Sequence, residues 1–136
     1  MPDRRHARGL VDTSVILDLD HLDVDSLPRE IAISAITLAE LAAGPQATED
    51  LEERARRQDR VQRAEAAFDP LPFDADAARA YGRVYAAVAR AGRRARGRRM
   101  ADLLIAATAV AAQLPLYTRN RKDFANLEKI ATIVSV

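Results

Sequence analysis

Short apolar runs and longer helical patterns alternate along this chain. The apolar runs are rich in leucine and β-branched residues and occupy residues 9–11, 31–33, 114–118 and 131–136, with a further short one near 69–73. Consecutive apolar positions, rather than a polar–apolar alternation, are typical of strands buried on both faces of a parallel sheet. Such strands, separated by helices, predict an α/β fold of the three-layer kind with a mainly parallel sheet.

Two of the helical patterns begin at side chains that are suited to capping. Ser34 precedes a pattern over residues 35–43, and Asp74 precedes one over residues 75–91. An oxygen at that position accepts a hydrogen bond from an amide of the first turn. The second of these helices has one apolar stripe, formed by Tyr81, Val84, Tyr85 and Val88. We expect this stripe, both tyrosines included, to face the core.

The other two helical patterns differ sharply in polarity. Residues 100–112 are almost entirely apolar, which predicts a buried helix with Asp102 as the charge of its first turn. Residues 47–67 are instead highly charged, with acids four positions before arginines, a spacing that favours surface ion pairs. These pairs are Asp50–Arg54, Glu52–Arg56, Glu53–Arg57 and Asp59–Arg63.

Length and composition add limits to this picture. The 136 residues suit a single domain over residues 1–136, and the formal net charge of +1 does not by itself indicate a partner. The chain has no cysteine, which excludes disulfides and thiolate metal sites and suits a reducing cytoplasm. We also find neither a signal peptide nor an apolar stretch of the roughly 20 residues that a membrane span needs. We therefore expect a soluble, cytoplasmic protein.

Arginines are concentrated in one segment, which contains five of them between Arg93 and Arg99. Two glycines, Gly92 and Gly97, interrupt the segment, so we expect a mobile basic loop. Such a loop provides the positive charge that attracts a phosphate backbone. The pattern therefore favours a nucleic-acid partner, although a merely solvated charged loop is also possible.

Four acids occupy comparable places in the predicted fold. Asp12 follows the strand at residues 9–11, Asp123 follows the strand at 114–118, and Glu40 and Asp102 lie on helices. In open α/β sheets the carboxyl ends of the strands border the ligand crevice, so these four can meet there. Four carboxylates repel one another, and a divalent cation with oxygen ligands relieves the repulsion. One or two such ions can support hydrolysis of a phosphodiester.

A second pair of acids suggests a different chemistry. Asp18 and Asp20 follow an apolar run in a D-x-D spacing that resembles the nucleophile motif of haloacid-dehalogenase phosphatases. His21 and Leu22 then replace the Gly-Thr pair of that motif. A solvated loop also explains these acids. The chain has no G-x-x-x-x-G-K or G-x-S-x-G motif, which removes P-loop and α/β-hydrolase interpretations.

Four motifs in order resemble a PIN-domain ribonuclease, and specifically a VapC-type toxin of a type II toxin–antitoxin pair. They are Val11-Asp12-Thr13-Ser14, Leu38-Ala39-Glu40-Leu41, Met100-Ala101-Asp102-Leu103-Leu104-Ile105-Ala106-Ala107-Thr108-Ala109 and Thr118-Arg119-Asn120-Arg121-Lys122-Asp123-Phe124. The resemblance covers essentially the whole chain. It implies a sheet of about five mainly parallel strands flanked by helices, and a metal-dependent endoribonuclease using Mg²⁺, with Mn²⁺ able to substitute.

The resemblance also implies roles for individual residues. The catalytic, metal-binding acids would be Asp12, Asp102, Glu40 and Asp123, with Asn120 competing for the fourth position. Contacts to substrate would come from Ser14, Thr118, Asn120, Arg98 and Arg99. The family implies a homodimer, an RNA substrate and a cognate VapB-like antitoxin that blocks the site, with no membrane partner. A non-catalytic RNA-binding module that uses the same acids to hold partner arginines is the remaining alternative.

Overall fold

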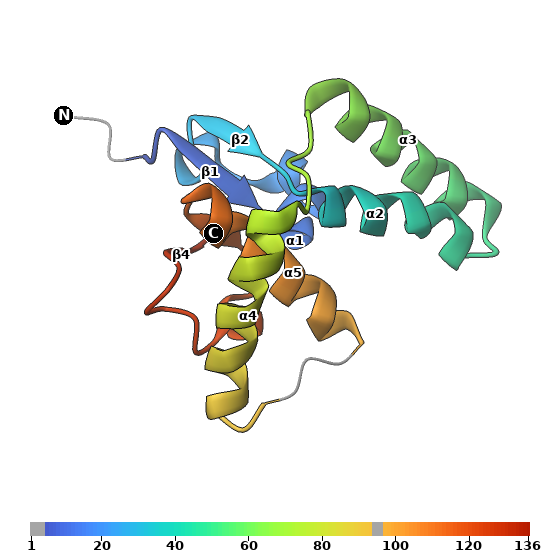
Figure 1. The fold of residues 1–136 in the computed structure, drawn as a ribbon. Coiled ribbons are helices and arrows are strands. Elements are labelled where there is room, and N and C mark those ends of the chain that lie inside the picture. The colour runs from blue at the N-terminus through green and yellow to red at the C-terminus, as the bar shows by residue number, and fades with distance from the viewer. Residues whose placement is uncertain (1–4, 94–96) are drawn as a thin grey trace.

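The computed structural model describes residues 5–93 and 97–136, and of Arg98 its place in the backbone but not its side chain. Four strands are present in this part of the chain: β1 (Arg8–Val11), β2 (Glu30–Ala32), β3 (Leu116–Thr118) and β4 (Ile133–Ser135). The α-helices are α1 (Thr13–Leu17), α2 (Ala35–Ala43), α3 (Leu51–Ala67), α4 (Ala75–Arg90) and α5 (Arg98–Ala112). Short 3₁₀ turns lie at Leu19–His21, Val24–Ser26, Gly44–Ala47 and Arg121–Phe124. The predicted α/β fold is confirmed (Figure 1).

All strands of the sheet run parallel, in the order β2-β1-β3-β4. The chain moves to one side of β1 to form β2, and later to the other side to form β3. This reversal makes the carboxyl end of β1 a topological switch point, where open α/β sheets have their ligand crevice. Asp12, which directly follows β1, is at that point.

Alternate residues of the strands feed two separate cores. Leu10, Leu116 and Ile133 pack on one face with buried residues of α4 and α5. Their strand neighbours Val11 and Tyr117 pack on the other face with residues of α1, α2 and α3. Helices on both faces explain why the strands read as continuous apolar runs. Figure 1 shows α2 and α3 lying beside each other as an arm that extends past the sheet.

The sheet has four strands among the described residues rather than about five. The segment near 69–73 forms a single parallel bridge between Ser34 and Leu71. Leu71 donates to Ile33 O (2.9 Å) and accepts from Ala35 N (2.8 Å). The residues on either side are Pro70 and Pro72, which have no amide hydrogen, so the ladder cannot extend.

Both predicted helix caps are present, but the expected apolar stripe of α4 is only partly buried. Ser34 Oγ accepts from Thr37 N, and Asp74 Oδ1 accepts from Ala77 N, each at 3.0 Å. Val84 and Val88 are buried, whereas Tyr85 is 52% exposed, so its predicted core position is wrong. The buried line of α4 instead continues through Ala77 and Ala80, because small side chains allow close approach of α5.

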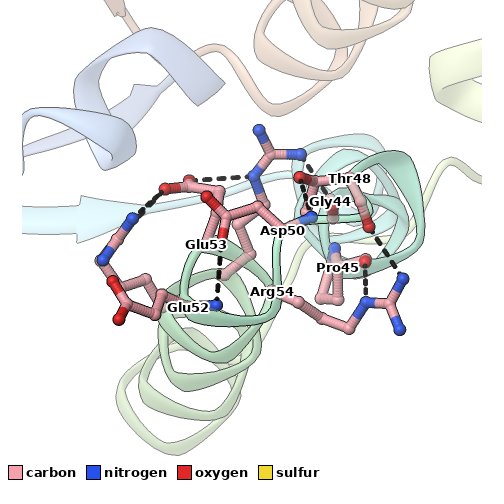
Figure 2. Close-up of polar contacts among 9 residues, drawn as sticks. Gly44, Pro45, Thr48, Asp50, Glu52, Glu53 and Arg54 are labelled. Carbon is pink, nitrogen blue, oxygen red and sulfur yellow. Dashed lines mark hydrogen bonds and ion pairs between the residues drawn. The ribbon is translucent and has the colours of Figure 1, made fainter.

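An arginine of α3 connects this helix to the 3₁₀ turn that follows α2. Arg54 donates from Nε to Pro45 O (3.1 Å) and from Nη2 to Thr48 O (2.8 Å), as Figure 2 shows. It therefore does not pair with Asp50, which caps α3 by accepting from Glu52 N (3.0 Å). These carbonyls lie in and just after the 3₁₀ turn Gly44–Ala47 that follows α2, and they are fixed acceptors that the i,i+4 rule does not include.

The other ion pairs of α3 are also partly rearranged. The expected Glu53–Arg57 and Asp59–Arg63 pairs form at 3.0 and 2.9 Å. Arg56 pairs with Glu53 at 2.7 Å instead of with Glu52. Two guanidinium groups thus share one carboxylate (Figure 2), and they lower the pKa of Glu53.

The arginine-rich segment is not entirely a loop. Helix α5 begins at Arg98, so Arg98 and Arg99 are helical, and residues 94–96 lie outside the described part of the chain. Arginine is a good helix former, and the left-handed Gly97 (φ 58°) is where the helix can start. Within the described residues, no helix is long and apolar enough to cross a membrane.

Candidate active site

Asp12 is held by hydrogen bonds to both of its carboxylate oxygens. As the N-cap of α1, its Oδ1 accepts from Val15 N (3.2 Å) and from Ser14 Oγ (2.6 Å). Its Oδ2 accepts from Thr118 Oγ1 (2.5 Å), at the end of β3. The side chain is fixed between two strands and a helix before any ligand arrives.

The pKa of Asp12 is raised above its ordinary value. Burial is the main cause, since the residue is only 4% exposed, and the nearby charge of Asp123 raises the pKa further. The bonds from Ser14, Thr118 and Val15 lower it, but not enough to offset burial. The ionised form of Asp12 is therefore destabilised by burial, and a nearby positive charge would stabilise it.

The turn after β3 fixes the two hydroxyls that contact Asp12. Ser14 Oγ accepts from Arg119 N (3.0 Å), and Thr118 Oγ1 accepts from Asn120 N (2.9 Å). Because an amide hydrogen fills one lone pair of each hydroxyl oxygen, the hydroxyl hydrogen is directed to Asp12. Both residues were predicted for this region, and the structure places both as donors to the acid.

Glu40 projects from α2 toward the same corner. Its Oε1 lies 2.6 Å from Thr13 Oγ1, which in turn lies 3.1 Å from Thr37 Oγ1. An ionised carboxylate only accepts, so Thr13 gives its hydrogen to Glu40 and its oxygen faces Thr37. Neither Thr13 nor the fully buried Thr37 was among the site residues predicted from the sequence. The available signals were a hydroxyl next to Asp12 and another one helical turn before Glu40.

Asp102 and Arg99 come to the site on α5. The sequence predicted Asp102 in the first turn of this helix. The prediction is wrong, because the helix starts at Arg98 and Asp102 is therefore in its second turn. Arg99, one turn earlier, has Nε and Nη2 buried with no hydrogen-bond partner among the described residues. The predicted contact from the Arg98 side chain lies outside what the structure describes.

These side chains line one cavity of about 370 Å³ at the carboxyl end of the sheet. The four predicted acids all border it, together with three of the five predicted substrate contacts: Asp12, Glu40, Asp102, Asp123, Ser14, Asn120 and Arg99. Thr13 and Leu17 complete the lining. Thr118 is fully buried behind Asp12 and does not border the cavity. We call this cavity the acid pocket.

The chemistry of the acid pocket fits a hard divalent cation. Its four carboxylates, two hydroxyls and one amide offer oxygen atoms as metal ligands. A cation would also stabilise the ionised form of Asp12, which burial disfavours. Within the described residues, no three acids or histidines are already grouped closely enough to hold an ion. A Mg²⁺ ion needs only one or two direct carboxylates, because it retains several waters.

Asp18 and Asp20 lie outside the acid pocket. Asp18 ends α1 rather than a strand, and it faces Arg119 at 3.5 Å. Asp20 is exposed in the following 3₁₀ turn. A nucleophilic aspartate of the phosphatase kind would have to follow a strand of the sheet, as Asp12 does. The phosphatase interpretation is therefore not supported.

Comparisons with known proteins agree with this geometry. Residues 9–130 match the model of the PIN domain family. Ribonuclease VapC5 of Mycobacterium tuberculosis is 37% identical over 130 residues, which cover 93% of this chain and 93% of that protein. The crystal structure of VapBC-5, a member of the VapBC family of toxin–antitoxin systems from the same organism, superposes with a TM-score of 0.83, covering 96% of this chain and 99% of that one. A DNA-bound VapBC structure from Salmonella typhimurium is 25% identical, with a TM-score of 0.70 and coverage of 94% and 97%.

Proposed function

The chain belongs to the PIN domain family, and from that premise we propose that it is the toxin of a type II toxin–antitoxin pair. Its reaction is the metal-dependent hydrolysis of RNA phosphodiester bonds in the acid pocket. The observation that carries the proposal is the convergence of Asp12, Glu40, Asp102 and Asp123 on one cavity, together with 37% identity to a named ribonuclease.

We assign Mg²⁺ as the cofactor, with Mn²⁺ able to replace it. Asp12 and Asp102 would hold it, and Glu40 and Asp123 would complete its surroundings directly or through water. When bound, the cation supplies charge neutralisation and a more acidic water. Ser14 and Thr118 keep the Asp12 oxygens oriented, and Thr13 does the same for Glu40.

We assign Arg99 and Asn120 to the substrate side of the pocket. An RNA phosphate provides the acceptors that Arg99 Nε and Nη2 do not have among the described residues. A guanidinium edge matches two phosphate oxygens at once. Arg98 would add charge at the same end of α5.

The partners we propose follow from the relatives. Structural relatives are toxin–antitoxin complexes, so a VapB-like antitoxin is the expected inhibitor, and an arginine from it can pair with carboxylates of the acid pocket. We also propose a homodimer. The protein acts in the cytoplasm, where its RNA is.

Cleavage of RNA by the purified protein tests the proposed function. We expect cleavage with Mg²⁺, none with EDTA, and a loss of at least about 10²-fold in Asp12→Asn and Asp102→Asn. Asp69→Asn is the matched control, because Asp69 is an exposed acid that borders neither the acid pocket nor the cavities beside it. Unchanged cleavage by both pocket variants, or RNA binding without any cleavage, would contradict the assignment.

A further inference from the structure

A groove leads from the acid pocket along helix α3. A neighbouring cavity of about 520 Å³ shares Thr13, Leu17 and Glu40 with the acid pocket and reaches Arg57 and Arg60. A third cavity, of about 240 Å³, shares Leu17 and Arg60 with the second and ends at Phe68. Each cavity shares lining residues with the next, so the three lie in a row that leads away from the acids, and we call this row the groove.

Arg60 differs from the other arginines of α3. Arg54 donates to backbone carbonyls, Arg56 and Arg57 pair with Glu53, and Arg63 pairs with Asp59. Arg60 is half-buried and borders both outer cavities, yet it has no ion pair or hydrogen bond within residues 5–93 and 97–136.

Five acids border the two outer cavities, and none of them pairs with Arg60 among the described residues: Asp18, Asp20, Glu40, Glu53 and Asp59. Three carboxylates along the groove have guanidinium partners: Asp18 with Arg119, Glu53 with Arg56 and Arg57, and Asp59 with Arg63. The pKa of Glu53 is lowered by its two partners, which shows that its charge is already well compensated. The guanidinium of Arg60 therefore has donors available, and an anion from outside the chain can accept from them.

A phosphate of a single-stranded RNA fits both the charge and the path. Arginine binds phosphate oxygens through its planar fork, and one strand lying along the groove would have its reacting phosphodiester at the acid pocket. Leu17, which is 42% exposed, and Phe68 offer apolar surface to a ribose or a base on the same route. Resting on the proposed function, we propose that Arg60 is a backbone-phosphate subsite for the RNA strand on one side of the cleaved bond.

Salt-dependent binding of RNA measures this contact without requiring cleavage. The probe is a fluorescein-labelled single-stranded RNA of mixed sequence, bound in EDTA across a series of KCl concentrations and followed by anisotropy. Each phosphate contact contributes about 0.7 to the slope of log K against log salt for a single strand. We expect Arg60→Gln to reduce the slope by about 0.7 and to weaken binding several-fold, and Arg60→Lys to retain most of the slope.

Arg79→Gln is the matched control. Arg79 is an exposed arginine on α4 that pairs with Asp76, and it borders none of the three cavities. Arg79→Gln removes the same charge as Arg60→Gln, so an effect of net charge alone would change the salt slopes of both variants equally. Thermal unfolding of each variant verifies that its fold is intact.

RNA length provides a second readout. If Arg60 contacts a phosphate away from the reacting one, very short oligonucleotides should bind wild type and Arg60→Gln equally, and the difference should appear only in longer ones. A slope for Arg60→Gln equal to that of wild type overturns the subsite, as does a defect confined to antitoxin binding. If RNA is cleaved and neither binding nor cleavage depends on Arg60, only the subsite proposal is wrong. If binding depends on Arg60 but no metal-dependent cleavage occurs, only the nuclease assignment is wrong.

Discussion

The two walls of the acid pocket are built differently. On the β1 wall, Asp12 receives three hydrogen bonds, and the two hydroxyls that give two of them are themselves held by backbone amides. On the α5 wall, Arg99 has two buried nitrogens with no acceptor among the described residues. The first wall is complete in the free protein, and the second has donors available for a ligand.

This difference separates two contributions to catalysis. Preorganised groups act through geometry that is present before binding, and disturbing them affects both folding and function. Donors without acceptors contribute only when a substrate arrives, so their removal affects function alone. Variants of the two walls should therefore differ in how far they affect stability as well as activity.

Of the variants that compare the two walls, Thr118→Val should have the largest effect, on both activity and stability. It removes the donor to Asp12 Oδ2 and the acceptor for Asn120 N. We expect about 10- to 100-fold slower RNA cleavage and a loss of about 1–3 kcal/mol in the free energy of unfolding. Urea denaturation and initial cleavage rates measure the two effects. Thr108→Val is the control, because Thr108 is equally buried but bonds only to Leu104 O within α5; a similar loss there would mean that the Asp12 contact is not special.

Arg99→Met should separate the two effects. No hydrogen bond of Nε or Nη2 to the described residues is lost, so we expect the stability change to be smaller than that of Thr118→Val. Loss of a charged hydrogen bond to phosphate should reduce kcat/KM by about tenfold. Arg99→Lys retains the positive charge but not the planar guanidinium, so its kcat/KM should lie between those of wild type and Arg99→Met. If Arg99→Met destabilises the protein as much as Thr118→Val does, the contrast between the walls is wrong.

The pH dependence of stability should be the smallest effect and should come from the β1 wall. Burial raises the pKa of Asp12, so the folded protein binds this proton more tightly than the unfolded chain does. The resulting stabilisation is complete below the unfolded pKa of about 3.9 and is lost as pH rises through the higher folded value. In EDTA, wild type should therefore lose stability relative to Asp12→Asn as pH rises from about 4. A constant difference in urea midpoints across that range would show that Asp12 is not strained by burial.

Much of this site was predictable from local sequence rules. Asp12 was placed at the carboxyl end of a strand, and the rule for parallel sheets brought Asp123 to the same edge. Ser34 and Asp74 were identified as caps, because capping depends only on residues a few positions away. The acids converge because the topology is fixed by the order of strands and helices.

Other features depend on contacts that no local pattern contains. The bond from Thr13 to Glu40 joins two different helices. Arg54 donates to carbonyls of the turn that follows α2 instead of pairing with the nearby Asp50. Tyr85 is exposed because α4 packs against α5 through its buried alanines, Ala77 and Ala80, and not through the side of the helix that carries Tyr85. The early start of α5 placed Arg99 in the pocket, although its sequence surroundings indicated a loop. Such outcomes are set by competition between distant partners.

Direct measurement of divalent-ion binding tests the central claim, that distant acids converge on one cation. Calorimetric titration of the metal-free protein with Mn²⁺, without RNA, should show a site in wild type that is lost in the Asp12→Asn, Asp102→Asn double variant. Asp18→Asn, Asp20→Asn should bind as wild type does, since neither residue borders the acid pocket. Equal Mn²⁺ binding by wild type and the Asp12, Asp102 double variant would contradict the account.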